Sequence, residues 1–264
     1  MEHYSDKEKD MATKKTETAA PEVLKIETQE LNLCIIGNSP LIHNAISERS
    51  MRELLFPAPK KNAAEKASSL KHDPIAEFRS SAHRVKGGPT LVGIPATAFK
   101  GALMTAALDL PGISKASIGR LVFVAGDLIP VWGVPEVLST TVRSADMAKT
   151  PDVRTRAIMR EWATKIRVKF VSPLLKQPPM INLVSAAGIT IGVGDWRPEK
   201  GKGSYGQFSI CNPDDPDFLR IIQSGGRDAQ QAAFDNPVAY DLTTEELLDW
   251  FNRTAAARGF KVAA

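Results

Sequence analysis

Strict alternation of side-chain type near the middle of the chain limits most strongly what this sequence can fold into. Three apolar and three cationic side chains take turns along it: Ile166, Val168 and Phe170 with Lys165, Arg167 and Lys169. Successive side chains of a β-strand point to opposite faces, so one face of this strand is apolar and the other is cationic. The pattern predicts a sheet that buries one face under other elements and leaves the second face in water.

The other segments follow the order of a ferredoxin-like plait. Along the chain we expect a strand at 26–36, a helix at 94–108, a hairpin at 121–132, a basic loop at 143–160, a strand at 162–171, a helix at 174–191, a glycine-rich loop at 192–206 and a strand at 206–210. We therefore predict an α+β fold, with an RRM-like or ferredoxin-like βαββαβ core whose two helices cover one face of the sheet.

Composition divides the chain into three parts. Residues 1–24 have balanced charges and no periodic apolar positions, which predicts a disordered arm. Residues 25–212 are expected to form one RRM-like domain, with a long insertion of short helices at 41–89 that is rich in Lys, Ala and Ser. Residues 213–264 are expected to form a C-terminal helical extension that packs or oligomerises, and Thr243 is the expected cap of its helix.

Charge and hydropathy indicate a soluble chain with an anionic partner. The formal net charge is +4 and the sequence pI is about 9.0. The longest apolar runs, such as 121–125 and 183–187, are far shorter than the ~20 residues of a membrane-spanning helix. Residues 1–24 also lack the apolar core of a secretion signal. We expect a cytoplasmic protein that makes no contact with a membrane.

Positive charge is concentrated between Arg143 and Lys169. This segment contains eight cationic and three acidic residues, an excess close to that of the whole chain. The candidate contacts to an anionic ligand within it are Arg154, Arg156, Lys165, Arg167 and Lys169. A solvated protein surface gives the same pattern, so the charge run leaves both interpretations open.

The glycine-rich segment 192–206 combines the residue types that bind nucleic acid. Glycines let backbone amides approach an anion, cations pair with phosphates, and aromatic rings stack on bases. The candidate residues are Trp196, Arg197, Lys200, Lys202 and Tyr205. No Gly-Lys-Ser/Thr opens a following helix and no dinucleotide fingerprint is present, so we predict no nucleotide cofactor. A glycine-rich hairpin with exposed charges is the alternative interpretation.

Two short motifs resemble those of a known superfamily. Residues 94–103, Ile-Pro-Ala-Thr-Ala-Phe-Lys-Gly-Ala-Leu, resemble the Pro-x-Ser-Ser-x-Lys-Gly-x-Leu helix start of the RAMP superfamily, whose members form the backbone of CRISPR effector complexes. Residues 203–206, Gly-Ser-Tyr-Gly, resemble the C-terminal glycine-rich loop of the same proteins. The resemblance covers residues 26–212 in the order of elements. A vaguer similarity, in Gly-x-Gly-x-Trp-Arg-Pro-Glu, is to uncharacterised proteins of bacteriophages and prophages.

The RAMP resemblance implies a protein that binds single-stranded RNA or DNA and forms a homo-oligomer along it. If a phage encodes the protein, the expected location is the cytoplasm of the bacterial host. It places Lys100, Gly203, Tyr205 and Gly206 at motif positions. It also implies that the insertion at 41–89 acts as a thumb-like or finger-like element.

Two other functions remain as alternatives. An interaction protein, structural or phage-encoded, would use its basic segment on an acidic partner and residues 247–251 to dock a neighbour. A metal-independent endoribonuclease would move a proton with His43 or Asp146, but no partner for either residue is identifiable. No bound metal is predicted, because the histidines lack metal-ligand spacing, and no motif predicts a catalytic nucleophile.

Overall fold

The computed structural model describes residues 24–57, 62, 65, 69–143, 150–260 and 262–263. Apart from Leu24, the predicted disordered arm at 1–24 lies outside these residues, as does Asp146. Within the described ranges, no helix has the length and apolar character needed to cross a membrane.

The core is an antiparallel sheet covered by two helices, which confirms the predicted α+β fold. Its elements are, in order, β1 (Glu27–Gly37), α4 (Ala96–Ala106), β5 (Val122–Val124) with β6 (Leu128–Trp132), β9 (Ala163–Ser172), α6 (Gln177–Ala186) and β10 (Phe208–Cys211). The strands pair in the order β10-β1-β9-β6, and β5 also pairs with β9. This is the 4-1-3-2 strand order of the ferredoxin-like plait.

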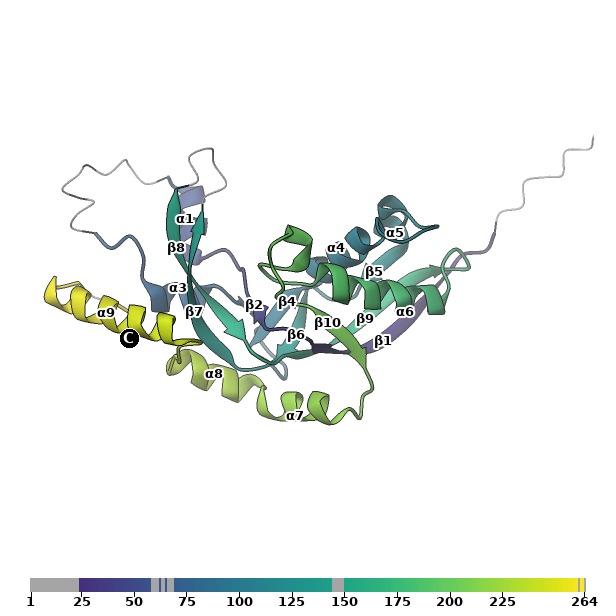
Figure 1. Cartoon of the computed structure of the whole chain (residues 1–264). Helices are drawn as coiled ribbons and strands as arrows, with labels where there is room; N and C mark the ends of the chain where they lie inside the picture. The colour runs from purple at the N-terminus through teal and green to yellow at the C-terminus, as the bar shows by residue number, and fades with distance from the viewer. Residues whose placement is uncertain are drawn as a thin grey trace, which may run out of the picture.

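Strand β9, whose side chains alternate between apolar and cationic, lies inside this sheet. Strand β1 pairs with one of its edges, and β5 and β6 pair with the other. Ile166, Val168 and Phe170 are buried against the helices. In Figure 1, α4 and α6 lie over one face of the sheet, while α7 (Pro216–Ser224) lies beneath the other. The opposite face is therefore only partly open to water.

The predicted hairpin at 121–132 is wrong. Strands β5 and β6 do not pair with each other but lie one after the other along β9, opposite residues 168–170 and 163–164 respectively. The Ala125 N–H donates to the Arg167 carbonyl between them, and Gly126 takes a φ of 95°. The Gly-Asp pair thus forms a kink in one edge rather than a turn, because β9 is long enough to pair with both strands.

The predicted basic loop at 143–160 is also wrong, since most of it is a strand. Strand β8 (Pro151–Met159) pairs over its whole length with β7 (Pro135–Arg143), and β2 (Leu41–Ile42) joins its other edge to form a second sheet. The last three residues of β8, Ala157, Ile158 and Met159, are buried. The burial of these three side chains offsets the conformational entropy that is lost when the β7–β8 hairpin becomes ordered. The outer part of this hairpin is cationic.

The segment predicted as an insertion contains α1 (Glu48–Leu55), α3 (Pro74–Ser80) and the short strand β3 (His83–Arg84). Helix α1 buries no side chain, whereas α3 buries Phe78 completely and packs on β8. Strand β3 pairs with β4 (Val92–Pro95), which pairs in turn with β6. The second half of this segment is therefore integrated into the core.

Three helices follow the plait: α7, α8 (Arg227–Asp235) and α9 (Leu242–Ala257). Asp241, rather than the expected Thr243, caps α9, because its carboxylate accepts the Thr244 N–H at 2.7 Å. The buried side chain of Gln230 joins α8 to the main sheet. Its oxygen accepts from the N–H groups of Leu91 and Val92, and its nitrogen donates to the carbonyls of Val131, Gly133 and Gly225.

Candidate functional site

The glycine-rich loop at 192–206 is folded tightly onto itself. The Val193 N–H donates to the Gly206 carbonyl at 2.9 Å, and the Tyr205 N–H donates to the Trp196 carbonyl at 3.2 Å. A Cβ at Gly203 would overlap that Trp196 carbonyl, and a Cβ at Gly206 would overlap the Val193 carbonyl. Both glycines are therefore required by close backbone approach, and the loop is a compact unit.

This loop presents an exposed indole ring. Trp196 is 38% exposed, and its φ of 50° lies in the left-handed region that non-glycine residues rarely adopt. The backbone N–H of Trp196 donates to the carboxylate of its neighbour Asp195 at 3.0 Å. The centroid of the indole ring lies 6.3 Å from that of the Tyr205 ring. A strained backbone that holds an apolar ring in water is typical of a binding surface.

The loop's cations differ in whether they have partners. Lys200, in the short helix η2 (Pro198–Lys200), and Lys202 are exposed, and neither forms an ion pair with any residue that the structure describes. Arg197, in contrast, donates to Glu199 at 2.8 Å and to the Gly194 carbonyl at 2.9 Å. We call Trp196, Lys200, Lys202 and Tyr205 the loop platform.

Two predicted arginines lie on β8 beside this loop. Arg156 pairs with Asp195 at 3.0 Å, and this ion pair ties the hairpin to the loop platform. Arg154 is 3.5 Å from Asp152 and half exposed. The structure therefore brings part of the basic segment and the glycine-rich loop to the same side of the molecule.

The three cations of β9 lie on the other side of the sheet. Arg167 and Lys169 both approach Glu30 of β1, at 3.8 and 3.6 Å. Lys165 lies 5.7 Å over the ring of Phe218 in α7. We call Lys165, Arg167 and Lys169 the sheet stripe. It is separated from the loop platform by the sheet and by the helices that cover it.

Lys100, the motif lysine of α4, belongs to neither group. Its ammonium lies 4.9 Å over the ring of Phe123 at the β5 edge of the sheet. The candidate residues predicted from the sequence are thus divided among three places in the fold.

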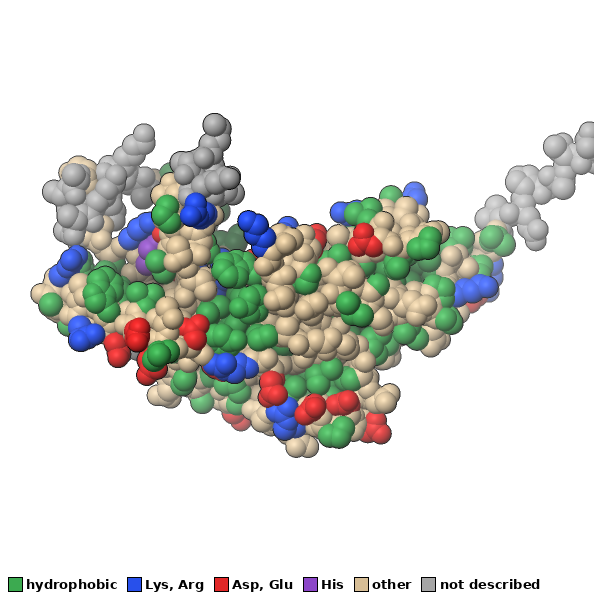
Figure 2. Space-filling view, viewed as in Figure 1, with side chains coloured by type: hydrophobic (Ala, Val, Ile, Leu, Met, Phe, Trp, Pro, Cys, Tyr) green, Lys and Arg blue, Asp and Glu red, His purple; other side chains and the backbone are tan. Residues whose placement is uncertain are grey.

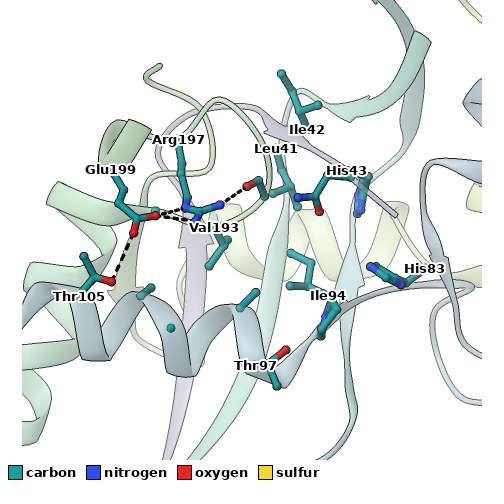
Figure 3. A pocket seen from close by; sticks show the side chains of 17 residues that line it. Leu41, Ile42, His43, His83, Ile94, Thr97, Thr105, Val193, Arg197 and Glu199 are labelled. Atoms are coloured by element: carbon teal, nitrogen blue, oxygen red, sulfur yellow. Dashed lines mark hydrogen bonds and ion pairs between the residues drawn. The ribbon is translucent and has the colours of Figure 1, made fainter. Parts of the chain in front are cut away.

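A cavity of about 310 Å³ lies beside the glycine-rich loop, which lines it with Gly192, Val193, Gly194, Arg197 and Glu199. Figure 3 shows His43 and His83 at one end of it and the Arg197–Glu199 pair at the other. Helix α4 and glycines 192 and 194 form further walls. His43 was a candidate from the sequence, whereas His83, Glu199 and the cavity itself were not foreseen.

The environment of His43 disfavours the charged imidazolium. Burial, with smaller contributions from His83 and Arg84, lowers its pKa to about 3. Its Nε2 has no hydrogen-bond partner in the described part of the chain. Burial also lowers the pKa of His83. Both rings are therefore mainly neutral at pH 7.

A second cluster of titratable side chains anchors the β7–β8 hairpin. His72 lies between two carboxylates, with Nδ1 2.6 Å from Glu77 and Nε2 2.9 Å from Asp152 of β8. The ammonium of Lys71 donates to Asp152 at 2.6 Å, and these hydrogen bonds lower the pKa of Asp152 to about 2. Among the described residues, no group of three or more His, Cys, Asp and Glu side chains is placed to hold a metal ion.

Comparison with known proteins gives weak similarities. No protein-family model and no curated protein matches the chain. One similar solved structure is the cryo-EM structure of the Type III-B Cmr-beta bound to cognate target RNA, at 14% identity and a TM-score of 0.35. The match covers 70% of this chain and 59% of that one.

Another similar structure is Cmr6 from Pyrococcus furiosus, at 10% identity and a TM-score of 0.35, with 70% of this chain and 98% of that chain covered. This chain therefore spans about 59% of the length of the first structure and nearly all of the second. Similarity at this level does not decide the function, which depends on the residues of this chain.

Proposed function

We propose that this protein binds single-stranded nucleic acid on the loop platform and the adjacent face of β8. The observation that supports this function best is Trp196, an exposed ring on a left-handed backbone with two unpaired lysines in the same loop. Single strands offer free base faces for such a ring, whereas a duplex keeps its bases stacked.

The charges fit this ligand. Lys200 and Lys202 can neutralise phosphates without breaking a close ion pair with a described residue, and Lys200 is near enough to Glu199 only to help lower the pKa of that carboxyl. Arg154 adds a half-exposed guanidinium along the path from the loop to the hairpin. Arg156 and Arg197 are held by Asp195 and Glu199, and we assign them the role of positioning the loop.

The proposal includes a relationship to the RAMP superfamily and assembly of several copies along one strand in the cytoplasm. Three residues match the glycine-rich motif of that superfamily. Gly203 and Gly206 lie where only glycine fits, and Tyr205 packs beside the exposed Trp196. A phage origin stays a prediction from the Gly-x-Gly-x-Trp-Arg-Pro-Glu segment.

Protein docking is the second candidate function, because two helices leave apolar side chains in water. Trp250 of α9 is 56% exposed, and α1 exposes Met51, Leu54 and Leu55. The endoribonuclease alternative gains nothing from His43, since its buried imidazole has no acid or base in hydrogen-bond contact with Nε2 among the described residues.

Fluorescence anisotropy with labelled oligonucleotides of about 15 nucleotides tests the proposal, since that length fills the site of known single-strand binders. We expect RNA or DNA single strands to bind more tightly than the matching duplex, with affinity that falls as salt is raised. No binding to either single strand at low salt would overturn the proposal. Co-purification of a protein partner without nucleic acid would favour docking.

A further inference from the structure

The cavity beside the glycine-rich loop is lined by a residue with a buried polar atom that no described residue satisfies. His43 is 2% exposed, and its backbone N–H is fixed by the Ala157 carbonyl at 2.9 Å. The side chain lines the cavity, and its Nε2 has no hydrogen-bond partner within the described ranges. A buried nitrogen without a partner destabilises the fold, so a ligand atom that bonds to it would recover that loss.

The lining of the cavity is close to electrically neutral. Arg197 is paired with Glu199, and Thr105 also donates to that carboxylate at 3.4 Å. The two histidines are mainly neutral, because burial lowers the pKa of each. A phosphate or carboxylate would find no uncompensated positive charge among these groups. The cavity therefore favours an uncharged ligand that can form hydrogen bonds.

Size and shape narrow this ligand to one small ring. The volume of about 310 Å³ lies at the lower end of the ~300–1,000 Å³ found for small-molecule sites. Apolar side chains from β2, β4, α4 and the loop form walls: Leu41, Ile94, Ala98 and Val193. Such walls suit the faces of a planar heterocycle, while His43 can bond to its polar edge (Figure 3).

We propose that the cavity receives a single nucleobase, turned out of the strand that the loop platform binds. This inference rests on the proposed function and adds a site to it. Glycines 192 and 194 form part of the cavity wall, and Trp196 follows Gly194 by two residues. The exposed ring and part of the cavity wall therefore belong to the same loop, so one strand can contact both.

The test uses a variant that fills the cavity without disturbing the fold. Gly101 lies on the cavity side of α4, and a Cβ placed there meets no atom within 4 Å. Gly101→Leu projects a side chain into the opening and removes a glycine from a helix interior, so we expect an unchanged or higher Tm. Gly87→Leu is the matched control, because Gly87 also has open space around its Cβ position but lies outside the cavity.

Affinity is measured by anisotropy with two probes, a single-stranded oligonucleotide of about 15 nucleotides and an abasic oligomer with the same phosphates. We expect Gly101→Leu to weaken binding of the base-bearing strand about tenfold and to leave the abasic oligomer unchanged, since only a base enters the cavity. Gly87→Leu is expected to match the unmodified protein with both probes.

Each other outcome has a definite meaning. Equal affinity of Gly101→Leu and the unmodified protein for the base-bearing strand overturns the base site and leaves the proposed function standing. Equal weakening with both probes also overturns it, because the cavity would then contact the backbone rather than a base. If the unmodified protein binds neither probe, both the proposed function and the base site are rejected.

Discussion

The sheet stripe and the loop platform contain similar cations in very different surroundings. In the sheet stripe, Arg167 and Lys169 share Glu30, and Lys165 covers an aromatic ring. In the loop platform, Lys200 and Lys202 have no ion pair with a described residue, and Trp196 is exposed beside them. Cations that already have partners contribute to the fold, whereas cations without partners are free to bind a ligand.

The surroundings of the two regions strengthen this contrast. Helix α7 packs against β1 and β9 on the side of the sheet stripe, and residues 213–264 contain nine acidic and five basic residues. Figure 2 shows Asp and Glu side chains gathered over the C-terminal helices, along the lower edge of the view. A polyanion approaching the sheet stripe would meet this acidic surface, which supports the proposed binding site on the loop platform.

The largest effect is expected from breaking the loop itself. Gly203→Ala would force a Cβ against the Trp196 carbonyl, and we expect a loss of at least about 2 kcal/mol in the free energy of unfolding and of most nucleic-acid affinity. Gly201→Ala is the control, because Gly201 has a φ of 77° but open space around it. We expect it to lose about 1 kcal/mol of stability and to keep its affinity. Urea denaturation and anisotropy measure the two quantities.

Removing the exposed ring is expected to have the next largest effect. Trp196→Ala should weaken binding of single strands by about 1–3 kcal/mol, the contribution of one base stacked on an aromatic ring. Trp250→Ala removes a more exposed indole, 56% against 38%, from α9 and should leave affinity unchanged. If the two variants bind equally well, the ligand does not stack on the loop platform.

Salt dependence compares the two regions directly. Replacing Lys200 and Lys202 together by Gln should reduce the slope of log K against log salt by about 1.4, because each phosphate neutralised on a single strand contributes ~0.7 to that slope. The matched change of Arg167 and Lys169 to Gln should alter the slope much less, because Glu30 already neutralises part of their charge. A larger change from the second pair would move the binding site to the sheet stripe.

Sequence reasoning recovered those parts of the fold that depend on local pattern. The alternation of 165–170 and the apolar spacing of 94–108 led to β9 and α4, and the positions of β1 and β10 followed the predicted order. The glycine-rich loop was recognised because its composition is local as well. What these segments share is that a few neighbouring residues determine their conformation.

The errors concern pairings between distant residues. A Gly-Asp pair suggests a turn, and only the length of β9 shows that β5 and β6 both pair with it. The strand β8 was hidden because Arg154 and Arg156 interrupt its pattern, and its continuous buried run begins at Ala157. The cavity is lined by both His43 and His83. These residues come together because β2 pairs with β8 and β3 pairs with β4.

The smallest expected effect concerns the anchor of the hairpin beside the loop platform. The pKa of Asp152 is lowered from 3.8 to about 2, so its ionised form stabilises the folded protein. This contribution is fully present above pH 3.8 and is lost as the pH falls through about 2. Because Asp152 is in contact with solvent, we expect Asp152→Asn to cost only about 1 kcal/mol at pH 7.

The affinity of Asp152→Asn for single-stranded nucleic acid also distinguishes the loop platform from the sheet stripe. Asp152 pairs with Lys71 and contacts His72, so its loss loosens β8 and the arginines next to the loop platform, while the sheet stripe stays as it is. Urea denaturation at pH 7 and near pH 2 should show the difference in stability between the variant and the unmodified protein shrink at the lower pH. A weaker affinity of Asp152→Asn for single strands at pH 7 would show that the hairpin supports the binding site, and an unchanged affinity would restrict the site to the loop.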